Sequence, residues 1–395
     1  MRRLPLVSTM LALALLAARG ASAQDVPARD SASRDTLPLD SAARDAAVRE
    51  AIARDSAERA EARRDSLASA ARSRSDLRHA AVFFADRTPL ELTLTANLRA
   101  LRAQTQEHDP WLSARLSYRP AGAEPVELAA QVRSRGNFRL KLCDFPPIRL
   151  RMRRADREGT VLEGLRRPKL VTYCKDREEY EQYVLQEYLA YRIYEQLTPI
   201  SLRARLARIT YVDSATGRPA ATRFGMVLEE EESLAARLDG VVLEAHGARP
   251  HHLDPFQATL LAVFQYMIGN TDWSIPALHN IFLVQTVPAV HPVAYDFDFA
   301  GIVNARYAAP DPKLGITRVT QRLYRGSCAT VDEIPGVLDH VRAQREAIVA
   351  ILDEPSELHP RHARRIRDFI EDFYELIESP RRVQVSITER CIPVN

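Results

Sequence analysis

The stretch from Phe264 to Gly301 constrains the fold of this chain more than any other. Asp254 and Pro255 have the pattern of an N-cap followed by proline in the first helical turn, and apolar residues continue at helical spacing as far as Ile268. Gly269 then ends the pattern. The sequence therefore predicts a buried helix that stops just before an acidic loop.

Two short apolar segments follow this loop and predict a β-hairpin. The first runs from Ile281 to Val284, and the second has aromatic residues at alternate positions between Val293 and Phe299. Strand alternation places Asp296 and Asp298 together on the face opposite the aromatics. Two carboxylates that point the same way are typical ligands of a divalent metal. The alternative interpretation is that these acids only form turns and cap loop amides.

The order of a loop aspartate, an asparagine and a hairpin aspartate resembles the catalytic segment of the protein-kinase-like superfamily. The resemblance is to the spore-coat kinase (CotH) family, with the HipA-type kinases as more distant relatives. It implies that Asp272 acts as the catalytic base, that Asn280 and Asp296 bind magnesium, and that Asp298 is an auxiliary ligand. The sequence departs from the family pattern in lacking a His-Arg-Asp triplet and in separating Asp272 from Asn280 by eight residues.

A second point of resemblance lies earlier in the chain. An Arg-Gly-Asn turn at residues 135–137 separates predicted strands, and Lys169 opens a further strand. The resemblance implies that the amides of Gly136 and Asn137 approach nucleotide phosphates, that Lys169 contacts the phosphates, and that Glu187 pairs with Lys169. Taken singly, the same residues also fit an ordinary turn, a solvated lysine and a surface ion pair.

These features together predict an α+β, two-lobed protein-kinase-like fold. We expect a β-rich N-terminal lobe over residues 81–232 and a mainly helical C-terminal lobe over residues 233–395, which contains the catalytic segment 264–301. The tail from Arg382 to Ile387 alternates and predicts an edge strand beside Cys391. Predicted strands are Leu90–Thr95, Trp111–Tyr118, Pro125–Arg133, Arg205–Asp213 and Phe224–Leu228, and predicted helices are Glu179–Leu197, Val331–Leu352 and Pro360–Ser379.

The N-terminal 80 residues differ in composition from the rest. Residues 1–23 have the charged start, apolar centre and small-residue cleavage site of a secretory signal peptide. Residues 24–80 consist mainly of Ala, Arg, Asp, Ser and Glu, with acids often four residues before an arginine, the favourable order for helical ion pairs. Residues 40–72 therefore predict either a polar helical stalk or a disordered linker. We expect an exported protein, periplasmic or extracellular, with no transmembrane segment and with a linker able to contact a cell-envelope partner.

Charge and cysteine content narrow the class of protein further. The net charge of +3 equals the three arginines of the signal peptide, so the remaining chain is formally neutral, which argues against a basic nucleic-acid-binding protein. Four cysteines are an even number in an exported chain and favour two disulfides. Three connectivities are possible. We prefer Cys143 with Cys174 and Cys328 with Cys391, because each pair then stays within one half of the domain.

The resemblance implies phosphoryl transfer that depends on ATP and magnesium, with manganese as the alternative metal. The acceptor is expected to be a hydroxyl of a protein or a small molecule. A non-catalytic, pseudokinase-like binding module of the cell envelope is the alternative, because ATP is scarce outside the cytoplasm. Residues 269–272 also resemble the Gly-Asn-His-Asp signature of metallophosphoesterases, but Thr271 stands where that family has histidine. The sequence leaves open the acceptor, the choice between phosphate and AMP, and the oligomeric state.

Overall fold

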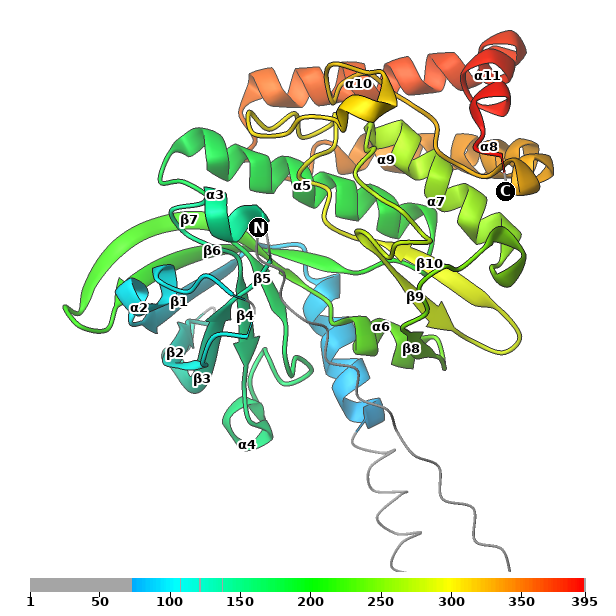
Figure 1. Ribbon diagram of the computed structural model, residues 1–395. Helices are drawn as coiled ribbons and strands as arrows, with labels where there is room; N and C mark the ends of the chain where they lie inside the picture. Colours follow the sequence, from blue (N-terminus) through cyan, green and yellow to red (C-terminus); the bar gives the residue numbers. More distant parts are fainter. Residues whose placement is uncertain (1–72, 107, 121, 137, 394–395) are drawn as a thin grey trace, which may run out of the picture. The chain divides into compact units, whose positions relative to one another are not determined.

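A closed barrel of seven strands forms the first half of the chain that the structure describes (Figure 1). The structure is a computed structural model, and it describes residues 73–106, 108–120, 122–136 and 138–393. Strand β1 pairs with β6 in parallel, and the other neighbours in the barrel pair antiparallel. In barrel order the strands are β1 (Leu90–Ala96), β2 (Leu112–Tyr118), β3 (Val126–Ser134), β4 (Ile148–Arg151), β5 (Lys169–Val171), β7 (Arg218–Leu228) and β6 (Ala204–Asp213).

Alternate side chains of these strands fill the barrel. In β4, Ile148 and Leu150 are buried in the core, so the residues between them face outward. Three aromatic rings pack together in this core. The Phe145 ring stacks on Tyr173 with 5.0 Å between centroids and meets Tyr211 edge-on at 4.6 Å. Residues 73–85 are helical and add two phenylalanines to the same core.

A second, larger core holds the helices and a small separate sheet. Helix α5 (Glu178–Leu197) packs against β6 and β7, and it is buried along most of its length. Its Tyr194 stacks on Phe264 of α7 (Pro255–Ile268) with 4.3 Å between ring centroids. The small sheet has the order β10-β9-β8. Its strands are β8 (Val241–Leu243), β9 (Ile281–Gln285) and β10 (Val290–Ala294).

Shorter elements complete the structure. The remaining α-helices are α2 (Leu98–Arg102), α3 (Phe138–Leu142), α4 (Arg154–Arg157), α6 (Glu231–Arg237), α8 (Ile334–Ala343), α9 (Arg345–Ile351), α10 (Pro360–Ile377) and α11 (Pro380–Ser386). The 3-10 helices are η1 (Pro250–His252), η2 (Pro312–Leu314), η3 (Cys328–Glu333) and η4 (Thr388–Arg390). Within the described chain, no helix is both long and apolar enough to cross a membrane.

The predicted two-lobed protein-kinase-like fold is wrong. The strands assigned to a β-rich lobe close into a seven-stranded barrel, and the helices pack around it. The closure depends on β1 pairing with β6, two strands separated by more than one hundred residues of sequence. Alternation in a sequence predicts that a segment is a strand, but it does not specify which distant strand becomes its neighbour.

Local signals predicted α5, α7 and α10, but they failed at Val331–Leu352, which divides into η3, α8 and α9, and at the C-terminal tail. Helix α7 begins and ends as expected, with the Asp254 carboxylate accepting from the Gln257 N–H at 2.7 Å and Gly269 in the left-handed conformation. The predicted edge strand at Arg382–Ile387 is wrong, because Ser379 caps α11 and proline occupies its first turn. The predicted signal peptide and the stalk or linker at residues 40–72 lie outside the described residues.

Both preferred disulfides are present. Cys143 joins Cys174, which ties the segment after α3 to the segment after β5. Cys328 joins Cys391, which ties the start of η3 to the C-terminal segment. The Cα atoms lie 4.5 Å apart in the first pair and 4.9 Å apart in the second. Each bond closes a loop within one half of the described chain, as the sequence argument expected.

Gly164 packs closely against the helix at residues 73–85, so a substitution there tests this contact. A Cβ atom at this position would lie 2.2 Å from the backbone nitrogen of Ala80. We expect Gly164→Ala to lower the free energy of unfolding by about 1–3 kcal/mol, as overpacking does, in urea denaturation. Gly336 in α8 has no atom within 4 Å of such a Cβ. Gly336→Ala is therefore the matched control and should not destabilise the protein; equal losses in both variants would contradict the contact.

Candidate functional site

The loop after α7 brings Asp272, His279 and Asn280 together. One oxygen of the Asp272 carboxylate lies 2.8 Å from Nε2 of His279, and the other accepts from Nδ2 of Asn280 at 3.0 Å. The same Asn280 nitrogen donates to the backbone oxygen of Asp272 at 2.8 Å. A bridge between Ser274 and His279 closes the loop. The eight-residue separation therefore does not keep the two predicted residues apart.

The loop fixes the Asp272 carboxylate but leaves it accessible. The Asp272 side chain is 39% exposed, and that of His279 is 55% exposed. Because both oxygens have hydrogen-bond partners, the carboxylate is held in one orientation while one edge stays open to a ligand. Such a group can orient a hydroxyl and accept its proton. Sequence reasoning missed His279, although its position directly before Asn280 was a usable signal.

Glu187, Asp296 and Asp298 form an acidic cluster between α5 and the segment after β10. Glu187 is 2% exposed and Asp298 is 4% exposed, whereas Asp296 is half-buried. The hydroxyl of Tyr307 donates to Asp298 at 3.0 Å. The sequence predicted that Asp296 and Asp298 would lie together, but it placed Glu187 beside a lysine. The cluster therefore joins predicted residues in a combination that the sequence did not indicate.

Burial and the repulsion of neighbouring acids raise the pKa values of Asp298 and Glu187. Desolvation is the largest cause at Asp298, and the charge of Asp296 adds to it, so that the pKa of Asp298 rises to about 7. At Glu187, desolvation and then the charges of Asp298 and Asp296 raise the pKa well above its ordinary value. Placing negative charge here costs free energy, so a positive ligand would be favoured.

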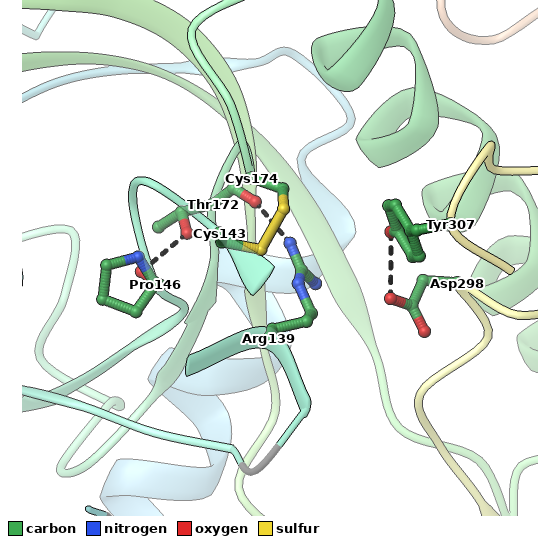
Figure 2. The surroundings of a disulfide bond; sticks show 7 residues. All are labelled: Arg139, Cys143, Pro146, Thr172, Cys174, Asp298 and Tyr307. Atoms are coloured by element: carbon green, nitrogen blue, oxygen red, sulfur yellow. Dashed lines mark hydrogen bonds between the residues drawn. A yellow bond between two sulfur atoms is a disulfide. The ribbon is translucent and has the colours of Figure 1, made fainter. Parts of the chain in front are cut away.

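Arg139 supplies positive charge to this cluster. Figure 2 shows Arg139 between the Cys143–Cys174 disulfide and the hydrogen-bonded pair of Asp298 and Tyr307. Its Nη2 donates to the backbone oxygen of Thr172 at 2.7 Å. Burial alone would lower the pKa of Arg139, but Tyr307 and the three carboxyls outweigh it and raise that pKa. Arg139 was not predicted, because nothing in its local sequence points to a distant acid.

The predicted strand through Asp296 and Asp298 is wrong. Strand β10 ends at Ala294, and Asp296 adopts a left-handed backbone conformation with φ of 63°. The Asp296 N–H donates to the hydroxyl of Tyr191 at 2.9 Å, and Phe297 is buried with 4.7 Å between its ring and that of Tyr191. Contacts with α5 therefore override the alternation, and the two acids are brought together by a turn.

Lys169 does not pair with Glu187 as predicted. It faces outward from β5, is only 6% exposed, and forms an ion pair with Glu231 in the first turn of α6. Its Nζ also lies 5.0 Å from the centre of the Tyr295 ring. Burial lowers the pKa of Lys169, although Glu231 opposes that effect. Lys169 and Glu231 are far apart in the chain, so the local sequence around either residue does not predict that they pair.

Lys169 belongs to a row of cations on the outer face of the barrel. Arg133 in β3 pairs with Arg149 in β4, and Arg149 pairs with Lys169 in β5. Arg135 follows β3, and its charge acts on both Lys169 and Glu187. The Nε atoms of the three arginines are buried without a hydrogen-bond partner among the residues that the structure describes. The row therefore adjoins the acidic cluster and has unused donors.

The predicted phosphate loop is described only in part. Gly136 has φ of 88°, a conformation that favours glycine, and no atom lies within 4 Å of where its Cβ would be. It follows the end of β3 by two residues, beside Arg135. Asn137 lies outside the described residues. The open space at Gly136 leaves its backbone free to approach a ligand.

A metal would have to use few protein ligands here. Among the described residues, no group of three or more His, Cys, Asp or Glu side chains is arranged to hold a metal ion. Magnesium commonly binds through only one or two carboxylates together with substrate phosphates. Asp296 and Asp298 suit that mode, and the amide oxygen of Asn280 remains for a ligand because its nitrogen binds Asp272. These carboxylate and amide oxygens are donors of the type that magnesium uses.

Comparison with known proteins does not identify a family for this chain. No family model matches it, and no curated protein sequence matches it. The resemblance to the spore-coat kinases therefore stays a hypothesis, and the functional argument depends on the geometry of the cation row, the acidic cluster and the Asp272 loop.

The pKa of Asp298 predicts a dependence of stability on pH. Its ordinary pKa is 3.8 and its folded pKa is about 7, so between these values the folded state retains a proton that the unfolded state loses. The free energy of unfolding should therefore fall as pH rises through this window, by on the order of 4 kcal/mol at 1.36 kcal/mol per pKa unit.

Urea denaturation without added divalent metal measures this slope. Asp298→Asn should reduce the slope, because this side chain no longer ionises, while the raised pKa of Glu187 leaves part of the dependence on pH. Asp339→Asn, at a carboxyl whose side chain is 77% exposed, is the matched control for the loss of one acid. An unchanged slope in Asp298→Asn would show that Asp298 is not the group responsible.

Proposed function

We propose that this protein binds ATP with magnesium or manganese and transfers a phosphoryl group to a hydroxyl of a protein or small molecule. One observation supports the proposal above the others. A row of cations with unused donors on the barrel adjoins a cluster of carboxyls that repel one another. Polyphosphate bound with a divalent metal has the complementary charges, because its oxygens are negative and its metal is positive.

The cation row favours an anionic ligand on energetic grounds. Like charges directly opposite each other on neighbouring strands destabilise a sheet, and Arg133, Arg149 and Lys169 occupy such positions. Glu231 offsets the charge of Lys169, whereas the buried Nε atoms of Arg133 and Arg149 have no partner within the described chain. Guanidinium donors match phosphate oxygens in geometry and charge. Phosphates at this row would pair with its cationic side chains and reduce the repulsion.

The acidic cluster favours a cation for the opposite reason. Asp296 and Asp298 act on each other and on Glu187, and these charges raise the pKa values of Glu187 and Asp298. A divalent metal held by Asp296 and Asp298 would stabilise their ionised forms. When bound, the metal nucleotide supplies the transferable phosphoryl group and neutralises charge on its oxygens. Arg135 adjoins both charge groups and would orient the phosphates between them.

Asp272 fits the role of the group that orients the acceptor. Asn280 holds one oxygen of its carboxylate and His279 lies against the other, so the side chain is fixed near its functional orientation. A hydroxyl placed at the open edge of Asp272 would donate a hydrogen bond to the carboxylate and could pass its proton to it. His279 would then steady the aspartate and supply the nearest additional site for that proton.

The two disulfides support an oxidising location, because such bonds persist mainly in secreted and periplasmic proteins. We therefore propose an exported protein, in line with the signal peptide expected at residues 1–23. ATP is scarce in such places, so a binding module without transfer activity stays the alternative.

The first experiment measures nucleotide binding by thermal and urea stability. ATP with magnesium at about one hundred times its dissociation constant should raise the free energy of unfolding by about 2.7 kcal/mol. Arg149→Gln removes the centre of the cation row and should weaken binding at least about tenfold. Arg115→Gln, at an arginine whose side chain is 62% exposed on β2, is the matched control. No shift in the wild-type protein with either magnesium or manganese would refute the proposal.

The second experiment separates the roles of two aspartates. Asp272→Asn should keep the nucleotide-dependent stabilisation and lose phosphoryl transfer, because the metal does not depend on it. Asp296→Asn should lose both, since it removes a metal ligand. Circular dichroism checks that each variant folds. Nucleotide binding without transfer in the wild-type protein would favour the binding module, and full transfer by Asp272→Asn would show that the base is elsewhere.

A further inference from the structure

A cavity of about 420 Å³ lies beside the Asp272 loop and has no role in the proposed reaction. Trp273 and Ile275 of the loop line one side, Leu253 and Ala262 line another, and Ile392 of the C-terminal segment lines a third. This volume lies in the range of small-molecule sites, about 300–1,000 Å³. Its lining is mostly apolar, so it is suited to a hydrophobic group rather than to a nucleotide.

The charged residues of the cavity are all of one sign. Two arginines, Arg249 and Arg325, line it, and within the described chain no aspartate or glutamate does. Nη1 of Arg325 donates to the backbone oxygens of Thr271 and Trp273, on either side of Asp272. Both of these hydrogen bonds, the ones that Arg325 forms with described residues, use Nη1, and the guanidinium carbon lies 5.7 Å from the centre of the Trp273 ring. One face of this guanidinium therefore holds the loop, and the rest is available to an anion.

The other polar side chains of the cavity each have at least one hydrogen-bond partner. The Ser274 hydroxyl accepts from the Ala277 N–H, and the Ser327 hydroxyl accepts from the Ala329 N–H. The indole N–H of Trp273 donates to the backbone oxygen of Asn270 at 3.2 Å. A ligand therefore meets mostly apolar surface together with arginine donors and the O–H groups of Ser274 and Ser327.

The wall formed by the C-terminal segment is fixed in place. The Ile392 N–H donates to the Gly326 oxygen at 2.8 Å, and the Ile392 oxygen accepts from the Cys328 N–H at 3.0 Å. The Cys328–Cys391 disulfide reinforces the same junction. The cavity is therefore bounded by cross-linked backbone on one side and by buried helix on the other.

From these contacts we infer that the cavity binds an amphiphilic carboxylate, with its hydrocarbon part against Trp273 and its head group on Arg325. A straight-chain fatty acid of medium length has this chemistry. Arg325 also donates to the backbone on both sides of Asp272. A carboxylate bound to this guanidinium would therefore share it with the Asp272 loop. The site is independent of nucleotide binding, so it is tested without ATP.

Tryptophan fluorescence tests whether a ligand binds beside Trp273. The chain has two tryptophans, so Trp111→Phe leaves Trp273 as the only reporter. Titration with hexanoate, octanoate and decanoate below their micelle concentrations should give saturable changes, with affinity rising about fourfold per added methylene. Decanol is the neutral control and should bind at least about tenfold more weakly than decanoate, because it cannot form the charge-assisted hydrogen bonds.

Variants then assign the binding groups. Arg325→Gln should weaken decanoate at least about tenfold and leave decanol unchanged. Ala258→Leu, at a half-buried lining residue of α7, should fill the cavity and abolish both. Ala343→Leu, at the exposed end of α8, is the control and should bind normally. No saturable response of Trp273, or decanoate binding retained in folded Ala258→Leu, would overturn the site; equal affinity for decanol would overturn the head-group assignment.

Discussion

Burial of Glu187 and Asp298 beside Arg139 is the constraint on which the rest of the site depends. Removing charges from water costs several kcal/mol per ion, and opposite charges offset this only where the geometry holds them together. Arg139 acts on all three carboxyls, and Arg135 also acts on Glu187. Burial and the charge of Asp296 nevertheless outweigh Arg139 at Asp298 and raise its pKa to about 7.

The architecture keeps Arg139 in place by several independent means. Its guanidinium donates to Thr172 at 2.7 Å, and the Cys143–Cys174 disulfide joins the end of its short helix to the segment after β5 (Figure 2). A five-residue helix is too short to be stable by itself, so the cross-link and the barrel must position it. The disulfide thus has a functional consequence, since it fixes a charge at the junction of the barrel and the acidic cluster.

How much the sequence could predict follows from the range of each interaction. The ends of α7 depend on Asp254 and Gly269, which act within one helical turn, and they were predicted correctly. The contact of Asp272 with Asn280 needed only a compact loop. The closure of the barrel and the Lys169–Glu231 pair depend on segments far apart in the chain, where local patterns have no information. The disulfides were predictable because only three connectivities were available.

Several residues of the candidate site adopt backbone conformations that their residue types disfavour. Non-glycine residues with positive φ include Leu278, Asn280 and Asp296, with φ of 49°, 51° and 63°. Such conformations are costly and persist where surrounding contacts determine them. Asn280 is held by its two hydrogen bonds to Asp272, and Asp296 by its N–H to the Tyr191 hydroxyl. The sequence pattern at Asp296 favours a strand, but its hydrogen bond to the buried Tyr191 of α5 stabilises a turn there.

The same principle links the Asp272 loop to its surroundings. Helix α7 fixes where the loop begins, the Asn280 and His279 side chains hold its carboxylate from inside, and Arg325 holds its backbone from outside. Burial lowers the pKa of Arg325, while the charge of Asp272 opposes that change and favours the ionised arginine. The guanidinium that holds this backbone also lines the neighbouring cavity, so the Asp272 loop and the cavity share one side chain.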